Sequence, residues 1–322
     1  MRAVVRERYG RPDVVEIREV EKPEPADDGV LVRVRAASLN RADWYALNGT
    51  PYFGRTQMGI RRPKEVVLGG DFAGVVEAVG KDVTDLSAGD EVYGTRTGAL
   101  AEYVSVRKGV GPKPASLSFE EAAALPIAGL TALQALRDKG QLQPGQRVLV
   151  NGAAGGVGTF AVQIAKALGA GELTAVCSGR NVELVRSLGA DHVVDYTQED
   201  FARSGRTYDL MVDVAGGRPW SDVKRVLEPE GTLVIVGAPM SGGLLGPLAG
   251  IGKLWLRSRR GSRKAVFFIA KVTKPDLAAL RGLVEDGKVK PFVERRYDLS
   301  EIADALRYLG GGHVQGKLVV TL

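Results

Sequence analysis

The chain has 322 residues, of which 44% are apolar and 25% charged, and its formal net charge is +6. This composition is typical of a globular protein with a large core, and the length favours two domains. The single cysteine excludes an internal disulfide, and no apolar run is long enough to cross a bilayer. Because the charged opening segment Met1–Glu7 does not resemble a signal peptide, we expect a cytoplasmic protein.

Short strand signals fill the first 118 residues. β-branched runs recur at residues 30–35, 74–79, 91–93 and 101–104, and many Gly, Pro and Asp residues separate them. This punctuation predicts a compact, antiparallel, barrel-like module. Residues 119–136 then have a helical character and lead into a second domain.

A glycine-rich turn is the most informative motif of the second domain. Residues 151–158 read NGAAGGVG, follow the apolar run 148–150 and open into an amphipathic helical pattern. Glycines let the backbone turn sharply and approach a pyrophosphate, and the helix start directs free N–H groups at the same phosphates. We therefore assign the turn to binding of a dinucleotide, through Gly155, Gly156, Val157 and Gly158.

Alternating strand and helix patterns follow the glycine turn. The expected strands are residues 173–177, 192–195, 210–213, 233–236 and 264–270, and the expected helices include 182–188 and 220–227. Apolar strands that alternate with helices predict a parallel, doubly wound sheet. Such sheets bind ligands outside the carboxyl ends of their strands, where the glycine turn lies.

The position that usually selects NAD carries no acid. An enzyme that prefers NAD usually has Asp or Glu about 20 residues beyond the glycines, to hold the ribose hydroxyls. That stretch, residues 177–181, here reads CSGRN. The Ser178 hydroxyl and the Arg180 guanidinium favour a 2′-phosphate, because a charge-assisted hydrogen bond contributes about 1.5–3 kcal/mol. We therefore predict NADP as the cofactor.

Residues 241–264 depart most from a minimal domain of this kind. The segment begins glycine-rich and apolar and ends in the basic sequence RSRRGSRK, which includes Arg257, Arg259 and Arg260. Four interpretations remain open: a solvated helix flank, a lid that brings Leu254 and Trp255 to an apolar substrate, a helix on anionic lipid, and an RNA-binding surface.

The tail is expected to return to the first domain. It contains helical patterns at residues 275–286 and 300–309 and a closing strand at 316–322. The predicted organisation is a β-rich catalytic domain and an NADP-binding domain with the active cleft between them. The first comprises residues 1–118 and 273–322, and the second residues 119–272.

Four motifs, in this order, resemble the medium-chain dehydrogenase/reductase superfamily and especially its zinc-free, quinone-oxidoreductase-like branch. They are ASLNRAD (37–43), GGDFAGVVEAVG (69–80), NGAAGGVG (151–158) and GGHVQGKLVV (311–320). The resemblance implies a GroES-like catalytic domain, a Rossmann domain, NADPH use and frequent homodimers. It also implies that the strand Lys264–Ala270 forms the dimer contact, since its apolar edge would otherwise invite uncontrolled pairing.

The zinc ligands of related alcohol dehydrogenases are missing from this chain. Those enzymes have Cys at the position of Asn40 and a His-Glu pair at Gly70-Asp71, and their four-Cys structural lobe is also absent here. The remaining candidate ligands fall in unrelated parts of the pattern: Cys177, His192 and His313. Since a catalytic zinc needs about three such ligands together, we predict no metal.

Without a Lewis acid, the substrate must be easily reduced or must meet hydrogen-bond donors, which favours quinones and enones. By resemblance, Tyr52 matches, with a one-residue offset, a tyrosine that protonates the enolate carbon in related enoyl reductases. Asn40 is expected to donate its amide to the nicotinamide or the substrate oxygen, and Tyr45 is a further candidate. Surface or packing roles for both tyrosines remain open, and Asp43 is expected to brace its own turn.

The resemblance also implies further residues around the cofactor. Thr131, Val236, Gly237 and Ala238 are expected beside the nicotinamide, and Ala215 near the adenosine ribose. Lys317 is expected near the cofactor phosphates and Tyr196 against the 2′-phosphate, although ordinary surface roles for these two remain open.

The predicted function is zinc-independent, NADPH-dependent transfer of hydride to a quinone, an enone or a related activated carbonyl. One alternative is a metal-free, NADP-dependent alcohol dehydrogenase that acts on saturated alcohols. Another is an NADPH-gated protein that binds RNA or a membrane surface with little turnover. The last alternative rests on the basic run and on the lack of an unmistakable catalytic acid.

Overall fold

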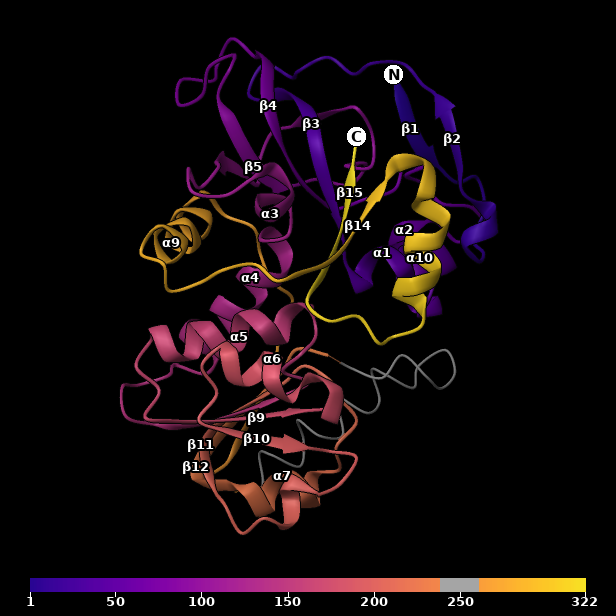
Figure 1. The fold of residues 1–322 in the computed structure, drawn as a ribbon. Helices are drawn as coiled ribbons and strands as arrows, with labels where there is room; N and C mark the ends of the chain where they lie inside the picture. The colour runs from indigo at the N-terminus through magenta and orange to yellow at the C-terminus, as the bar shows by residue number, and fades with distance from the viewer. Residues whose placement is uncertain (238–260) are drawn as a thin grey trace. The chain divides into compact units, whose positions relative to one another are not determined.

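The computed structural model describes residues 1–237 and 261–322, which form two compact units (Figure 1). Unit 1 comprises Met1–Leu130, Lys271–Asp286 and Pro291–Leu322, and unit 2 comprises Thr131–Ala270 and Gly287–Lys290. In the part of the chain that the structure describes, no helix has the length and apolar character that crossing a membrane requires.

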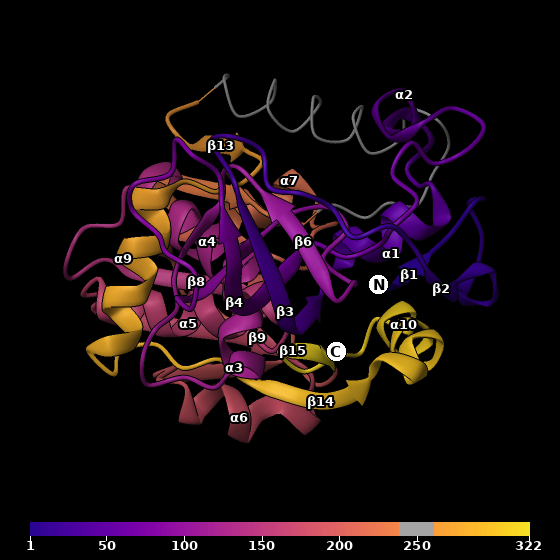
Figure 2. The same cartoon turned by 90° about the horizontal axis from the view of Figure 1, so that it is seen from above.

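A seven-stranded sheet organises unit 1. Its strand order is β14-β15-β3-β4-β5-β7, and β6 pairs with β3 outside this path. Neighbouring strands are antiparallel except for β14 and β15, and Figure 2 shows the paired strands β3 and β4 from above. The seven strands are β3 (Val30–Leu39), β4 (Asp71–Val79), β5 (Glu91–Thr95), β6 (Tyr103–Val106), β7 (Val110–Pro112), β14 (Val293–Asp298) and β15 (Lys317–Thr321). A separate antiparallel pair consists of β1 (Arg2–Val5) and β2 (Glu16–Glu19).

Helix α10 (Ile302–Gly310) packs on this sheet through an apolar face. α10 buries Ile302, Ala305, Leu306 and Leu309, a spacing that places them on one side of the helix. This face packs with β3 and β15 in one core cluster. The helices are α1 (Arg41–Asn48), α2 (Arg55–Met58), α3 (Phe119–Ala123), α9 (Lys274–Glu285) and α10 (Ile302–Gly310), and α4 (Pro126–Leu133) runs on into unit 2.

The first helix after residue 118 lies in unit 1. The sequence pattern assigned residues 119–136 to the nucleotide-binding domain, but α3 packs on β3 and β4 of unit 1. Its buried residues Ala122 and Ala123 are small enough to let the helix approach that sheet. The division of the chain into a catalytic and a cofactor-binding domain stays a prediction.

A six-stranded parallel sheet organises unit 2, in the order β10-β9-β8-β11-β12-β13. This order confirms the predicted doubly wound sheet, with its first strand in the middle. The strands are β8 (Arg147–Asn151), β9 (Glu172–Cys177), β10 (His192–Asp195), β11 (Tyr208–Asp213), β12 (Leu227–Ile235) and β13 (Lys264–Phe267). The helices are α5 (Gly156–Ala167), α6 (Val182–Ser187) and α7 (Trp220–Val226), and Gln134–Lys139 is π-helical.

The helix after the glycine turn is buried more completely than its sequence pattern predicts. The pattern indicates one apolar face, but α5 buries every residue from Gly158 to Ala165. Gln163 is tolerated there because its side-chain amide donates to the carbonyl oxygen of Lys290 over 3.0 Å and accepts from the Lys290 N–H over 2.8 Å. These two bonds attach the short segment Gly287–Lys290 to unit 2.

Candidate functional site

The glycine turn of unit 2 joins the end of β8 to the start of α5. A Cβ on Gly158 would collide with the carbonyl oxygen of Gly152, so the close passage of helix and turn requires glycine at residue 158. A Cβ on Gly155 would meet nothing closer than 3.6 Å. The protein therefore leaves space beside Gly155, the N-terminal cap of α5, where the free N–H groups of a helix can bind a phosphate.

A buried carboxylate braces this turn, and sequence reasoning missed it. Asp213, 4% exposed, ends β11 beside β8. Its Oδ1 accepts from Asn151 Nδ2 over 2.7 Å and from the Gly216 N–H over 2.9 Å. Burial raises the pKa of Asp213, and these two hydrogen bonds oppose that rise. The sequence signal was an acid directly after the apolar run Leu210–Val212.

The residues predicted to hold a 2′-phosphate follow the ends of β9 and β10. Ser178 is the N-cap of a short 3₁₀ turn that contains Arg180, and its hydroxyl accepts from Asn181 Nδ2 over 3.0 Å. Tyr196 is 55% exposed, and its N–H donates to the Cys177 carbonyl oxygen over 3.0 Å. The structure thus brings Ser178, Arg180 and Tyr196 to one end of the sheet.

The predicted nicotinamide-side residues lie beyond the end of β12. The N–H groups of Val236 and Gly237 both donate to the Asp213 carbonyl oxygen, over 3.0 and 3.1 Å. A Cβ on Gly237 would collide with the carbonyl oxygen of Val214, so only glycine fits there. Thr131 lies on α4 and is half-buried. Ala238 and most of the basic segment 241–264 lie outside the described residues.

Four polar side chains meet inside unit 1 at the start of α1. Lys317 Nζ donates to Asn40 Oδ1 over 2.5 Å and lies 3.8 Å from Asp71 Oδ2. Asn40 Nδ2 donates to the same Asp71 oxygen over 2.8 Å. The side chains of Lys317 and Asp71 are 2% and 0% exposed, so the ion pair is buried together with its hydrogen bonds. We name Asn40, Asp43, Asp71 and Lys317 the Asn40 cluster.

The charges of this cluster fix the orientation of the Asn40 amide. Its oxygen faces an ammonium group and its nitrogen faces a carboxylate. The flipped amide would place NH₂ against the ammonium of Lys317 and oxygen against the carboxylate of Asp71, and both contacts would be repulsive. One amide N–H is used by Asp71, which leaves the second as the only donor that the side chain can offer to a ligand.

Asp43 closes the cluster from the first turn of α1. Its Oδ2 accepts from the Asn40 N–H over 2.7 Å in a capping box, which confirms the predicted bracing role. Burial raises the pKa of Asp43 to about 7, and the nearby Asp71 carboxylate acts in the same direction. Burial also raises the pKa of Asp71 and lowers that of Lys317, while the attraction between these two groups opposes both changes.

Sequence reasoning did not predict the Asn40 cluster as a unit. The surface alternative for Lys317 is wrong, because the structure buries this ammonium in the core of unit 1, on Asn40. Its expected place near the cofactor phosphates stays a prediction. Asp71 appeared only as the residue at a missing zinc ligand position. The available signals were a lysine directly before the apolar run LVV and an acid at the start of the apolar strand β4.

The two tyrosine candidates lie on α1 and just after it. Tyr52 is 54% exposed, and its ring centre is 4.8 Å from the Arg55 guanidinium. Tyr45 is partly buried, with its ring centre 5.7 Å from the Arg41 guanidinium. Among the described residues neither hydroxyl is hydrogen-bonded to the Asn40 cluster. Their catalytic roles stay predictions.

Within residues 1–237 and 261–322, no three His, Cys, Asp or Glu side chains gather where they could hold a metal ion. Two of the three remaining candidate ligands lie at opposite ends of neighbouring strands in unit 2. Cys177 is buried at the carboxyl end of β9, and burial raises the pKa of its thiol to about 11. His192 begins β10 and lies 3.3 Å from Glu172.

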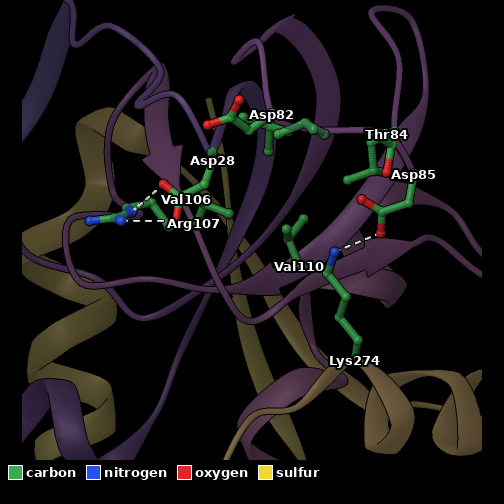
Figure 3. Close-up of a pocket in the computed structure, with 12 residues that line it drawn as sticks. Asp28, Asp82, Thr84, Asp85, Val106, Arg107, Val110 and Lys274 are labelled. Atoms are coloured by element: carbon green, nitrogen blue, oxygen red, sulfur yellow. Dashed lines mark hydrogen bonds and ion pairs between the residues drawn. The ribbon is translucent and has the colours of Figure 1, made fainter.

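A separate hollow of about 320 Å³ opens in unit 1 (Figure 3). Two ion pairs line it, Arg107 with Asp28 at 2.5 Å and Lys274 with Asp85 at 2.6 Å. None of the predicted site residues lines this hollow. Asp82 also lines it, outside these two pairs, and we assign the hollow no role in the site.

Comparisons with known proteins agree with this geometry. Residues 26–115 match the family described as an alcohol dehydrogenase GroES-like domain, and residues 188–320 match the family described as a zinc-binding dehydrogenase. A chloroplastic quinone-oxidoreductase homolog of Spinacia oleracea is 33% identical over 97% of this chain and 95% of its own. The chloroplastic NADPH-dependent alkenal/one oxidoreductase of Arabidopsis thaliana is 35% identical over 99% of this chain and 79% of its own.

Solved structures share the whole fold. The quinone oxidoreductase from Coxiella burnetii has a TM-score of 0.88 and 31% identity, with 100% of this chain and 99% of that one covered. The Escherichia coli quinone oxidoreductase, solved in complex with NADPH, has a TM-score of 0.83 and 25% identity, with both chains covered completely.

The expectation of a cytoplasmic protein is wrong by this comparison. The spinach and Arabidopsis relatives are named as chloroplastic, and a mouse relative, 35% identical over 91% of this chain and 81% of its own, is a mitochondrial NAD(P)H oxidoreductase. Similar solved chains also come from bacteria. A low cysteine content distinguishes reducing from oxidising surroundings but does not distinguish among reducing compartments.

The resemblance seen in the sequence motifs is thus confirmed along the whole chain. The GroES-like match, the six-stranded parallel sheet and the full-length similarity to quinone oxidoreductases agree. The chain belongs to the quinone-oxidoreductase branch of the medium-chain dehydrogenase/reductase superfamily.

Proposed function

We propose that this protein is a zinc-independent oxidoreductase that uses NADPH to reduce a quinone, an enone or a related activated carbonyl. The observation that carries the proposal is the Asn40 amide, fixed as a hydrogen-bond donor by a buried ion pair. Relatives named for quinone and for alkenal/one reduction support the substrate class.

The residues of unit 2 fit an NADP cofactor. Gly155 leaves space at the start of α5, and Asp213 braces the adjoining turns. Ser178, Arg180 and Tyr196 would hold the 2′-phosphate, and Val236 and Gly237 would lie beside the nicotinamide. When bound, NADPH supplies the hydride. We propose the matching division of labour, with unit 2 for the cofactor and unit 1 for catalysis, so that residues 119–130 belong with the catalytic part.

The Asn40 cluster takes the place that metal ligands occupy in zinc enzymes. When a quinone or an enone is reduced, negative charge collects on an oxygen, and a donor that is already oriented stabilises that charge without reorganisation. The free N–H of Asn40 would donate to this oxygen, and the Lys317 ammonium on the amide oxygen strengthens the donor by polarising it. Tyr52 remains our candidate for delivering a proton.

The proposal extends to a homodimer through β13. This strand is at the edge of the unit 2 sheet, and Phe267 and Ile269 at and just beyond its end are 42% and 80% exposed. Covering such an edge prevents uncontrolled pairing. Light scattering would test this part: a dimer that Ile269→Lys converts into a monomer supports it, and a wild-type monomer contradicts it.

Loss of NADPH absorbance with metal-stripped protein tests the function. We expect enzyme-dependent loss with a small simple quinone or an enone that a chelator leaves unchanged, and slower loss with NADH. NADPH binding without turnover of either substrate would contradict the reductase. NADP-dependent oxidation of a saturated alcohol in their place would support the metal-free alcohol dehydrogenase. Salt-sensitive RNA binding that requires Arg257, Arg259 and Arg260 would support the binding protein.

A further inference from the structure

The ends of β9 and β10 lie side by side where the adenosine part of the cofactor is proposed to bind. The register pairs Asp195 with Cys177, the last residue of β9. The Tyr196 N–H donates to the Cys177 carbonyl oxygen over 3.0 Å and extends this pairing by one step. Asp195, which is distant in sequence from the glycine turn, therefore lies beside the segment Ser178–Arg180.

The carboxylate of Asp195 points at that segment. Its Oδ1 accepts from the N–H and the hydroxyl of Thr197, over 2.9 and 2.8 Å. Its Oδ2 lies so close over Gly179 that a Cβ built on that glycine would be 2.5 Å away. Oδ2 accepts no hydrogen bond from the residues that the structure describes. The negative charge of Asp195 also contributes to the raised pKa of the Cys177 thiol.

An acid at this place has opposite effects on the two nicotinamide cofactors. A carboxylate accepts hydrogen bonds from the free ribose hydroxyls of NADH, and it repels the 2′-phosphate of NADPH. The usual rule places the acid at the end of the strand that follows the glycine helix, and there this chain has none. Asp195 supplies a carboxylate from the next strand instead.

We infer that Asp195 is a specificity-determining residue for the cofactor, and that its carboxylate enables the protein to bind NADH as well as NADPH. This inference rests on the proposed function, because it needs the adenosine ribose to lie at Ser178–Arg180. Ser178 and Arg180 favour binding of the 2′-phosphate, whereas Asp195 opposes it. The preference for NADPH over NADH is therefore weaker than Ser178 and Arg180 alone would give.

Titration of protein fluorescence with NADPH and with NADH measures the two dissociation constants. Asp195→Asn removes the charge but keeps an oxygen for Thr197. We expect NADPH to bind about tenfold more tightly to this variant, and NADH about threefold more weakly, because an amide keeps only part of the acceptor capacity. Asp195→Ser removes the same charge with a shorter side chain, and we expect its preference to change in the same direction.

A matched control removes a charge elsewhere in unit 2. Glu230 is exposed on β12, in a bulge remote from the carboxyl end of that strand, so Glu230→Gln changes the net charge equally and is expected to leave the ratio of the two constants unchanged. Wild-type protein that binds neither cofactor would contradict the proposed function. If the ratio of the NADPH and NADH dissociation constants is the same in the wild type and in both Asp195 variants, the inference about Asp195 is overturned and the proposed function stays intact.

Discussion

The two polar regions of this protein differ in how their hydrogen-bonding capacity is used. In the Asn40 cluster of unit 1, Lys317 and Asp71 form a buried ion pair, and one N–H of the Asn40 amide is left over. At the carboxyl end of the unit 2 sheet, Gly155 leaves room for a Cβ, Tyr196 is exposed, and one oxygen of Asp195 is not hydrogen-bonded to any of the described residues. The first arrangement suits a donor that must not move, and the second suits a ligand that supplies the missing partners.

Breaking the ion pair in the Asn40 cluster should have the largest effect. Lys317→Met leaves the Asp71 carboxylate buried without its cation, which typically costs about 3–5 kcal/mol of unfolding free energy. Urea denaturation measures this loss. The double variant Lys317→Met with Asp71→Asn removes both charges and should recover most of the stability but not the reductase rate. If the single variant has the same unfolding free energy as the wild type, the ion pair of Lys317 and Asp71 does not stabilise the fold.

Filling the glycine turn should abolish cofactor binding with a smaller effect on folding. In Gly158→Ala the added methyl group collides with the Gly152 carbonyl oxygen and displaces the turn, and we expect the affinity for NADPH to fall about 100-fold. Gly282→Ala is the matched control, because a Cβ there meets nothing within 4 Å. In helix α9 that change should stabilise the protein by about 0.5–1 kcal/mol. Unchanged NADPH affinity in Gly158→Ala would contradict the assignment of the turn.

The pH dependence of stability tests the Asn40 cluster separately from the carboxyl end of the unit 2 sheet. The pKa of Asp43 rises on folding, from 3.8 to about 7, so folding favours its protonated form. This contribution is complete below pH 4 and is lost as the pH rises toward 7. Asp43 also interacts electrostatically with Arg6, Asp71 and Lys317, so their titration changes with its charge. Only the difference between Asp43→Asn and the wild type therefore isolates Asp43.

We expect the stability of the wild type, relative to Asp43→Asn, to fall between pH 4 and 7 by about 4 kcal/mol. Chemical denaturation at a series of pH values measures it. A difference that is constant across this window would show that Asp43 is ionised in the folded protein.

Removing one side chain at the carboxyl end of the unit 2 sheet should have the smallest effect, a loss of affinity for one cofactor only. Arg180→Ala loses a charge-assisted hydrogen bond to the 2′-phosphate, and the affinity for NADPH should fall about tenfold while that for NADH changes little. Equal losses for both cofactors would indicate that Arg180 supports the turn itself. Titrating this variant together with Asp195→Asn shows how much each of the two residues contributes to the preference for NADPH over NADH.

Local patterns predicted most of unit 2. The run His192–Asp195 forms β10 with the predicted bounds, and the glycine turn lies between a strand and a helix, because β-branched runs and glycines act over a few residues. The full burial of α5 was not predictable, because two of the hydrogen bonds that satisfy Gln163 come from the distant Lys290. That pairing brings together segments that no local pattern connects.

The functional groups that sequence reasoning missed all depend on distant partners. Asp71 and Lys317 lie on β4 and β15, and neither strand's own pattern shows that they form a pair. A search confined to residues 177–181 overlooked Asp195, since the neighbouring parallel strand supplies it. Asn40 was predicted as a donor from resemblance, but its orientation follows from charges that only the fold brings together.

The most direct test of the account is the rate of hydride transfer in a single turnover with bound NADPH and a simple quinone. We predict that Asn40→Asp and Asn40→Ala, which both lack the amide donor, slow this step about 100- to 1,000-fold while NADPH affinity changes little. If both variants fold, bind NADPH and transfer hydride within twofold of the wild-type rate, the Asn40 cluster is a structural core and not the site of catalysis.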